Sequence, residues 1–87
     1  MKLDPVQAAD LEELRRLGEE AKDLRYSANV KEADRVRLAR DGLIYRLAEG
    51  GVSKTLIARM ADVHRVLVYR IKDSYPERLR RWQEQHQ

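Results

Sequence analysis

The chain has 87 residues, a formal net charge of +3 at pH 7, no cysteine and one tryptophan. This length suits one small domain, and the lack of cysteine excludes disulfides and thiolate metal sites. No apolar run approaches the roughly 18 residues of a membrane span, and no signal-peptide core is present, so we expect a cytoplasmic protein without membrane contact.

The first predicted helix begins at Asp4-Pro5, because Asp caps helix starts and Pro suits the first helical position. It should end between Arg25 and Ala28. Gly18 weakens its middle by roughly 1 kcal/mol relative to Ala. After Val6 and Ala9, its apolar positions form a stripe with heptad-like spacing, made of Leu14, Leu17, Ala21 and Leu24.

Two uses of this stripe stay open. It can fold back on its own domain, or it can pair with the same helix of a second copy to form a homodimer. Charged residues make up 38% of the chain, which leaves a thin core, and a two-fold operator requires two copies. We therefore separate residues 1–30, a candidate dimerisation element, from residues 31–87.

The remaining helices are expected at about residues 31–49, 53–61, 64–73 and 76–84. Gly50-Gly51 should end the first of these, and Pro76 should begin the last. The inner stripe of the helix at 31–49 consists of Ala33, Val36, Ala39, Leu43, Ile44, Leu47 and Ala48. The expected fold class is all-α, with a trihelical core, an extra N-terminal helix and a short C-terminal helix.

Residues 51–72, GVSKTLIARMADVHRVLVYRIK, carry the pattern of a helix-turn-helix. Ser53 can cap the first helix, Ala58 is small where the helices approach, and Asp62 tolerates the positive φ that the turn needs. The inward positions are Ile57, Ala61, Val63, Val68 and Ile71. An ordinary helical hairpin in a small bundle is the alternative.

This segment resembles the C-terminal DNA-binding module of the serine recombinases (resolvases and invertases) and similar modules of transposases and small regulators. The shared signature is G-x-S-x-x-x-I-A-x-x-x-G-V-S-x-x-T-V-Y-R, which the chain matches at Gly51, Ser53, Ile57, Ala58, Val63, Val68, Tyr69 and Arg70. It departs from the signature at Asp62, His64 and Leu67. The resemblance implies a helix-turn-helix fold with a DNA-facing surface, and it implies that Arg70 contacts bases.

Charge supports the same region, because residues 51–87 carry eight bases and four acids, whereas residues 1–30 carry seven acids and five bases. The outer face of the second motif helix should contact base edges through Arg65, Val66, Tyr69 and Arg70. For the two arginines a phosphate contact or a free surface charge is the alternative, and for Val66 a partial core position. Phosphate contacts are expected from Ser53, Lys54, Thr55, His64, Arg78, Arg80 and Arg81. For the last three arginines, a solvated face around Leu79 and Trp82 is the alternative.

No catalytic set accompanies the motif. His64 and His86 are the only histidines, and neither a nucleophile–base pair nor a Gly-rich phosphate loop is present. We expect no enzyme activity, cofactor or metal.

The predicted function is sequence-specific binding of double-stranded DNA by a small bacterial or phage transcriptional regulator or repressor. It would act by occupancy, and would block or recruit RNA polymerase or a recombinase. One alternative is an accessory protein for DNA recombination or packaging. The other is a protein-interaction module on the same scaffold, which Val66, Leu67 and the acidic first helix favour.

Overall fold

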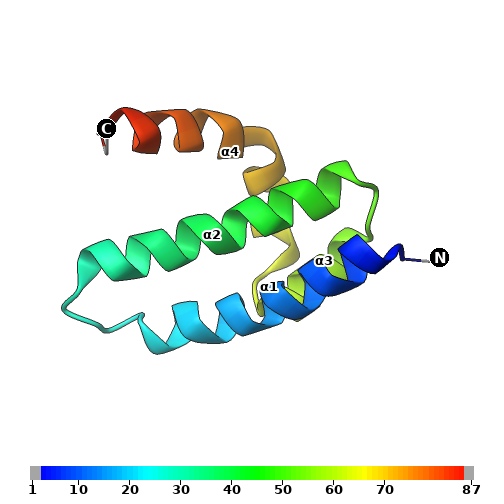
Figure 1. Ribbon diagram of the computed structural model, residues 1–87, viewed down its shortest axis with the longest axis horizontal. Coiled ribbons are helices and arrows are strands. Elements are labelled where there is room, and N and C mark those ends of the chain that lie inside the picture. The colour runs from blue at the N-terminus through cyan, green and yellow to red at the C-terminus, as the bar shows by residue number, and fades with distance from the viewer. Residues whose placement is uncertain (1–2, 86–87) are drawn as a thin grey trace.

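A computed structural model describes residues 3–85 and shows four α-helices, with no strand in that range. They are α1 (Pro5–Asp23), α2 (Val30–Glu49), α3 (Lys54–Ala61) and α4 (Arg65–Gln85). Figure 1 shows α1 and α2 as an antiparallel hairpin, with α3 beside α1, while α4 crosses α2 and then runs back along it. The predicted all-α class is confirmed. Within residues 3–85, no helix has both the length and the apolarity that crossing a membrane requires.

Side-chain caps define the helix starts much as the sequence predicts. The Asp4 carboxylate accepts a hydrogen bond from the Gln7 backbone N–H at 2.7 Å, and the Gln7 side chain accepts one from the Asp4 N–H. Asn29 caps α2 in the same way by accepting from the Glu32 N–H at 3.1 Å. These caps satisfy N–H groups that the first turn of a helix leaves without partners. α1 ends at Asp23, slightly before the expected stretch.

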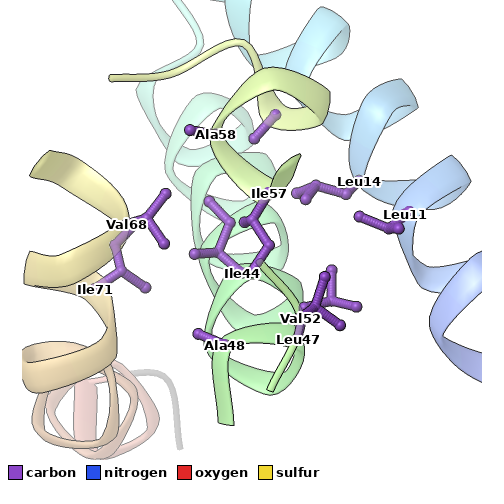
Figure 2. Packing of buried hydrophobic residues seen from close by; sticks show 11 residues of the cluster. Leu11, Leu14, Ile44, Leu47, Ala48, Val52, Ile57, Ala58, Val68 and Ile71 are labelled. Carbon is purple, nitrogen blue, oxygen red and sulfur yellow. The ribbon is translucent and has the colours of Figure 1, made fainter. Parts of the chain in front are cut away.

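One core joins all four helices. Figure 2 shows Ile44 of α2 and Ile57 of α3 at its centre, with Leu14 of α1 on one side and Val68 of α4 on the other. Each of these four side chains has no exposed surface. The cluster also contains Leu11, Leu47, Ala48, Val52, Ala58, Ala61 and Ile71. The inward positions predicted for the motif are confirmed, with Val63 partly buried. α1 therefore shares the core of the motif helices.

The predicted stripe of α1 packs within its own chain. Leu17 and Ala21 form a second cluster with Val36 of α2, and Leu24 packs against that cluster. Leu14 belongs to the main core. The first alternative for these four residues, packing on the same domain, therefore describes them. Leu14, Leu17 and Ala21 are buried within the chain and Leu24 is partly buried, so the homodimer through this stripe stays a prediction that the packing does not favour.

The faces of α1 and α2 differ in detail from the predicted stripes. Leu11 is buried but was not among the expected core positions, whereas Val6 and Ala9 are exposed. On α2, Ala39 is exposed rather than inward. For Ala9 and Ala39 the reason is that a small Ala fits either face of a helix, so periodicity alone does not place it.

Residues 65–85 form one helix, which corrects the expectation of two helices separated before Pro76. Proline removes one i→i−4 hydrogen bond and bends a helix without always ending it. Figure 1 shows α4 changing direction in this region. Contacts with α2 hold the helix on both sides of the bend, because the Tyr75 ring stacks on Tyr45 and Arg78 pairs with Asp41.

α1 approaches the end of α3 closely at Gly18. A Cβ atom built on Gly18 would lie 2.5 Å from the carbonyl oxygen of Ala61. No larger residue fits there unless the backbone moves. Nearby, the Lys22 ammonium lies 3.3 Å from the Asp62 carboxylate in an exposed ion pair. Gly18 thus allows α1 to pack directly against the turn that precedes α4.

Gly18→Ala should destabilise the protein although Ala favours helix formation by roughly 1 kcal/mol. The methyl group would collide with the backbone of Ala61, and such overpacking costs about 1–3 kcal/mol. Thermal unfolding of the variant should show a lower Tm. Gly42→Ala is the matched control, because the Gly42 Cβ would meet the movable hydroxyl end of the Tyr75 side chain. A Gly18→Ala variant more stable than wild type would contradict the close packing.

Candidate nucleic-acid interface

Local hydrogen bonds and one left-handed residue define α3 and the turn that follows it. Ser53 caps α3 by accepting from the Leu56 N–H at 3.4 Å, as predicted. Asp62 takes the left-handed conformation, with φ 56° and ψ 50°, which confirms the predicted turn position. The Val63 N–H then donates to the Ala58 carbonyl at 3.0 Å, which closes the turn.

His64 supplies the cap of α4. Its ring nitrogen Nδ1 accepts a hydrogen bond from the Val66 N–H at 3.1 Å. A serine hydroxyl at this position would serve the same N–H groups. The departure from the recombinase signature at residue 64 therefore leaves the helix start capped. The side chain is exposed beside the first turn of α4.

The first half of α4 has one buried and one open face. Val68 and Ile71 are buried, whereas Arg65, Tyr69 and Arg70 are exposed. Val66 and Tyr69 leave 49% and 48% of their surface accessible, a large fraction for apolar and aromatic residues. We call the surface of Arg65, Val66, Tyr69 and Arg70 the outer face of α4. The structure thus brings the four predicted base-contact residues together on one accessible surface.

Leu67 and Asp73 bound this surface. Leu67 is partly buried and packs against the main core, so it is not part of the open face. Asp73 is exposed one turn beyond Tyr69 and Arg70. Its negative charge ends the cationic stretch of the helix.

The start of α3 lies beside the outer face of α4. The Lys54 ammonium lies 5.5 Å from the centre of the Tyr69 ring, in cation–π geometry. Ser53 and Thr55, the other two residues predicted to contact phosphate there, are exposed. Residues predicted for phosphates and for bases are therefore neighbours in space.

The charges of this region differ from those of the other helices. On α1 and α2, arginines are paired with nearby carboxylates, as in the contacts of Arg15 with Glu12 and Arg46 with Asp10. In α3 and the first half of α4, the described part of the chain offers no carboxylate within ion-pair distance of the cations. These cations are Lys54, Arg59, Arg65, Arg70 and Lys72. Positive charge is thus left without ion pairs on α3 and on the first half of α4.

The three arginines near the C-terminus have partners within the chain. The Arg78 guanidinium lies 2.8 Å from the carboxylate of Asp41, whose side chain is only 3% exposed. Arg80 donates to both oxygens of Glu77 at 2.6 Å, and this hydrogen bond lowers the pKa of the Glu77 carboxyl. Arg81 lies 3.4 Å from the same carboxylate. Figure 1 shows this part of α4 along α2, away from α3.

The expected phosphate cluster at residues 78, 80 and 81 is therefore engaged in intramolecular pairs. Arg78 in particular neutralises the buried Asp41 together with Arg40, whose Nε lies 3.0 Å from the same carboxylate. The solvated-face alternative suits Arg80 and Arg81, which remain exposed.

Three residues of this arrangement were not predicted from the sequence. Arg59 and Lys72 belong to the unpaired cations of the motif, and their charge and position in the basic half of the chain could have drawn attention to them. Asp41 gave no such signal, because an isolated Asp inside a polar helix is normally exposed.

Comparisons with protein-family models, curated proteins and solved structures found no match to this chain. Within residues 3–85, no three acidic or histidine side chains are grouped to hold a metal ion. His86 lies outside the described residues.

Arg78→Ala should lower stability by about 1–3 kcal/mol, because it removes a charged hydrogen bond from the buried Asp41 and leaves Arg40 as its partner. Arg80→Ala is the matched control and should change stability by less than about 0.5 kcal/mol, since its pair with Glu77 is exposed. Denaturant unfolding of both variants measures the difference. Equal stabilities would remove the structural role of Arg78.

Proposed function

We propose that the chain binds double-stranded DNA as a helix-turn-helix protein, with the first half of α4 in the major groove. The observation that carries this proposal is the set of unpaired cations around the outer face of α4, next to the exposed Val66 and Tyr69. Carboxylates elsewhere in the chain pair with most of the other arginines. A polyanion such as DNA therefore binds most favourably at the outer face of α4. The proposed class is a small bacterial or phage transcriptional regulator that works in the cytoplasm.

Phosphate contacts would supply most of the affinity. Each cation that replaces a condensed counterion adds to binding and to its salt dependence. Lys54 at the start of α3 suits this role, because it has no ion pair and lies against Tyr69 of the outer face. Arg59 is an exposed cation on the same helix. Backbone N–H groups near Ser53 and Thr55 add donors that favour an anion. These contacts would fix the orientation of α4 without reading sequence.

Base readout would come from the outer face itself. An arginine can donate two hydrogen bonds to O6 and N7 of guanine in the major groove, and Arg65 and Arg70 both have unengaged guanidinium groups. Val66 lies between them in the helical surface and offers an apolar contact for a thymine methyl group. Tyr69, supported by Lys54, would pack at the edge of the groove.

The proposed mechanism is occupancy. A protein bound across a promoter or a recombination site blocks or recruits RNA polymerase or a recombinase without any chemical step. A protein-interaction module remains the rival function, and the exposed Val66 and Tyr69 are the observation that favours it. Leu67 no longer supports this rival, because it packs against the core.

The test uses Arg70→Ala and a duplex selected from a random pool by the wild-type protein. Loss of a bidentate guanine contact should weaken binding to the selected duplex by about 1–3 kcal/mol. Binding to scrambled duplex should fall much less, because the phosphate contacts remain. Fluorescence anisotropy at fixed salt measures both affinities.

Two further variants complete the experiment. Lys54→Ala should weaken binding to both duplexes alike and reduce the salt slope by about one. Arg80→Ala is the matched control on α4, the helix that carries Arg70, and should change neither affinity, because Glu77 already holds the guanidinium. If wild type binds neither duplex at low salt, the DNA-binding proposal fails and the protein-interaction function takes its place.

A further inference from the structure

A small hollow of about 80 Å³ lies where α1, α2 and the turn after α3 meet. Two small residues of α1 line part of it, and its other lining residues are charged: Gly18 and Ala21, then Lys22, Arg25, Arg37, Arg40 and Asp62. A volume of this order holds a few water molecules or one tetrahedral oxyanion, and it is too small for a nucleoside. We call this space the arginine hollow.

Arg40 is held in place on one side. Its side chain is only 15% exposed, and its Nε donates to the buried carboxylate of Asp41 at 3.0 Å. That bond uses the Nε–H, and a guanidinium carries further N–H donors on its terminal nitrogens. An arginine that is already fixed by a carboxylate loses little side-chain freedom when it also binds an anion. Arg40 is therefore a preorganised donor at the hollow.

The other cations of the hollow have exposed pairs or none. Arg25 has no ion pair with a carboxylate in the described part of the chain. Lys22 lies 3.3 Å from Asp62 and Arg37 lies 3.4 Å from Asp34, with all of these side chains more than 40% exposed. Exposed ion pairs contribute little to stability, so an anion in the hollow can share these cations with their carboxylates.

The charge left after this pairing is positive. The four cations of the hollow and Arg78, which shares Asp41 with Arg40, make five positive groups. The carboxylates that pair with them are Asp34, Asp41 and Asp62. Two positive charges are thus not neutralised within this group, which suits a doubly charged oxyanion. Guanidinium groups also match the oxygens of phosphate in geometry.

We propose that the arginine hollow binds one phosphate group, held by Arg25, Arg37 and Arg40 with Lys22 at the edge. The ligand is free phosphate or the phosphate group of a small molecule whose remainder lies in solvent. A small ligand is favoured over a DNA phosphate, because the hollow is small and Arg40 is recessed in it. This site is additional to the proposed function and does not depend on DNA binding.

An NMR titration of the labelled chain with inorganic phosphate at constant ionic strength tests the site. Saturable shift changes should centre on the amides of Gly18, Arg25 and Arg40, with an apparent Kd below about 10 mM. Arg25→Gln should raise this Kd about tenfold, since it removes a charge-assisted hydrogen bond. Arg35→Gln is the matched control, because Arg35 is an exposed arginine of α2 outside the hollow, and it should leave the Kd unchanged.

Asp62→Asn tests the site in the opposite direction. It removes the carboxylate that lines the hollow, and Asn also tolerates the positive φ of this turn. The variant should bind phosphate about threefold more tightly, because like-charge repulsion is lost. A purely structural role of Asp62 would give no such gain.

A parallel titration with methyl phosphate distinguishes the two sources. Binding equal to that of inorganic phosphate shows that a phosphate ester fits, whereas much weaker binding assigns the hollow to the free ion. The proposal is overturned if phosphate causes no saturable change, or if Arg25→Gln binds it as well as wild type does. A salt slope of duplex binding that falls by about one in Arg25→Gln also overturns it, because a DNA phosphate would then occupy the hollow.

Discussion

The contact between Gly18 and Ala61 governs the arrangement of the other helices. α1 approaches the last turn of α3 so closely that no β-carbon fits at residue 18. The next residue of the chain, Asp62, adopts positive φ, and the direction of α4 follows from that turn. Any shift of α1 would therefore move the start of α4. A helix that is extra to a minimal three-helix motif thus becomes part of the support for the proposed DNA-binding surface.

The core explains why that surface can remain open. Ile44, Ile57 and Val68 have no exposed surface, so α2, α3 and α4 are fixed by one apolar face each. The opposite face of α4 is not needed for packing and stays accessible. Two ion pairs also join helices, Arg46 with Asp10 between α2 and α1 and Arg78 with Asp41 between α4 and α2. The second ion pair holds the half of α4 beyond Pro76 against α2.

Paired and unpaired arginines lie on different helices. Arginines on α1 and α2 are neutralised within the chain, whereas those on the outer face of α4 are not. Exposed ion pairs contribute little to stability, so their value here is to limit where net positive potential appears. The proposed DNA surface is more positive than the other faces for two reasons. Its own cations are unpaired, and the arginines of α1 and α2 are neutralised by carboxylates.

Local sequence signals predicted much of this structure. Asp4, Ser53 and Asp62 carry their roles in their own chemistry as caps and turn residue, and the structure confirms each of them. The helix start predicted at Pro76 was wrong, because a helix tolerates one missing hydrogen bond where tertiary contacts hold it on both sides. Asp41 and its partner Arg78 lie 37 positions apart, and no local pattern reports such a pair.

The outer face of α4 was predictable from helical periodicity once Val68 and Ile71 were placed inward. What the sequence alone did not reveal is which cations lack partners. That property depends on the tertiary neighbours of each guanidinium, as the contrast between Arg70 and Arg78 illustrates.

An NMR titration of the isotopically labelled chain with a short DNA duplex shows directly which surface binds DNA. The largest amide shift changes should fall in residues 53–72, where α3 begins and the outer face of α4 lies. Amides of α1 and of the second half of α4 should change little. Changes concentrated on α1, or on residues 77–85, would contradict the proposed binding surface.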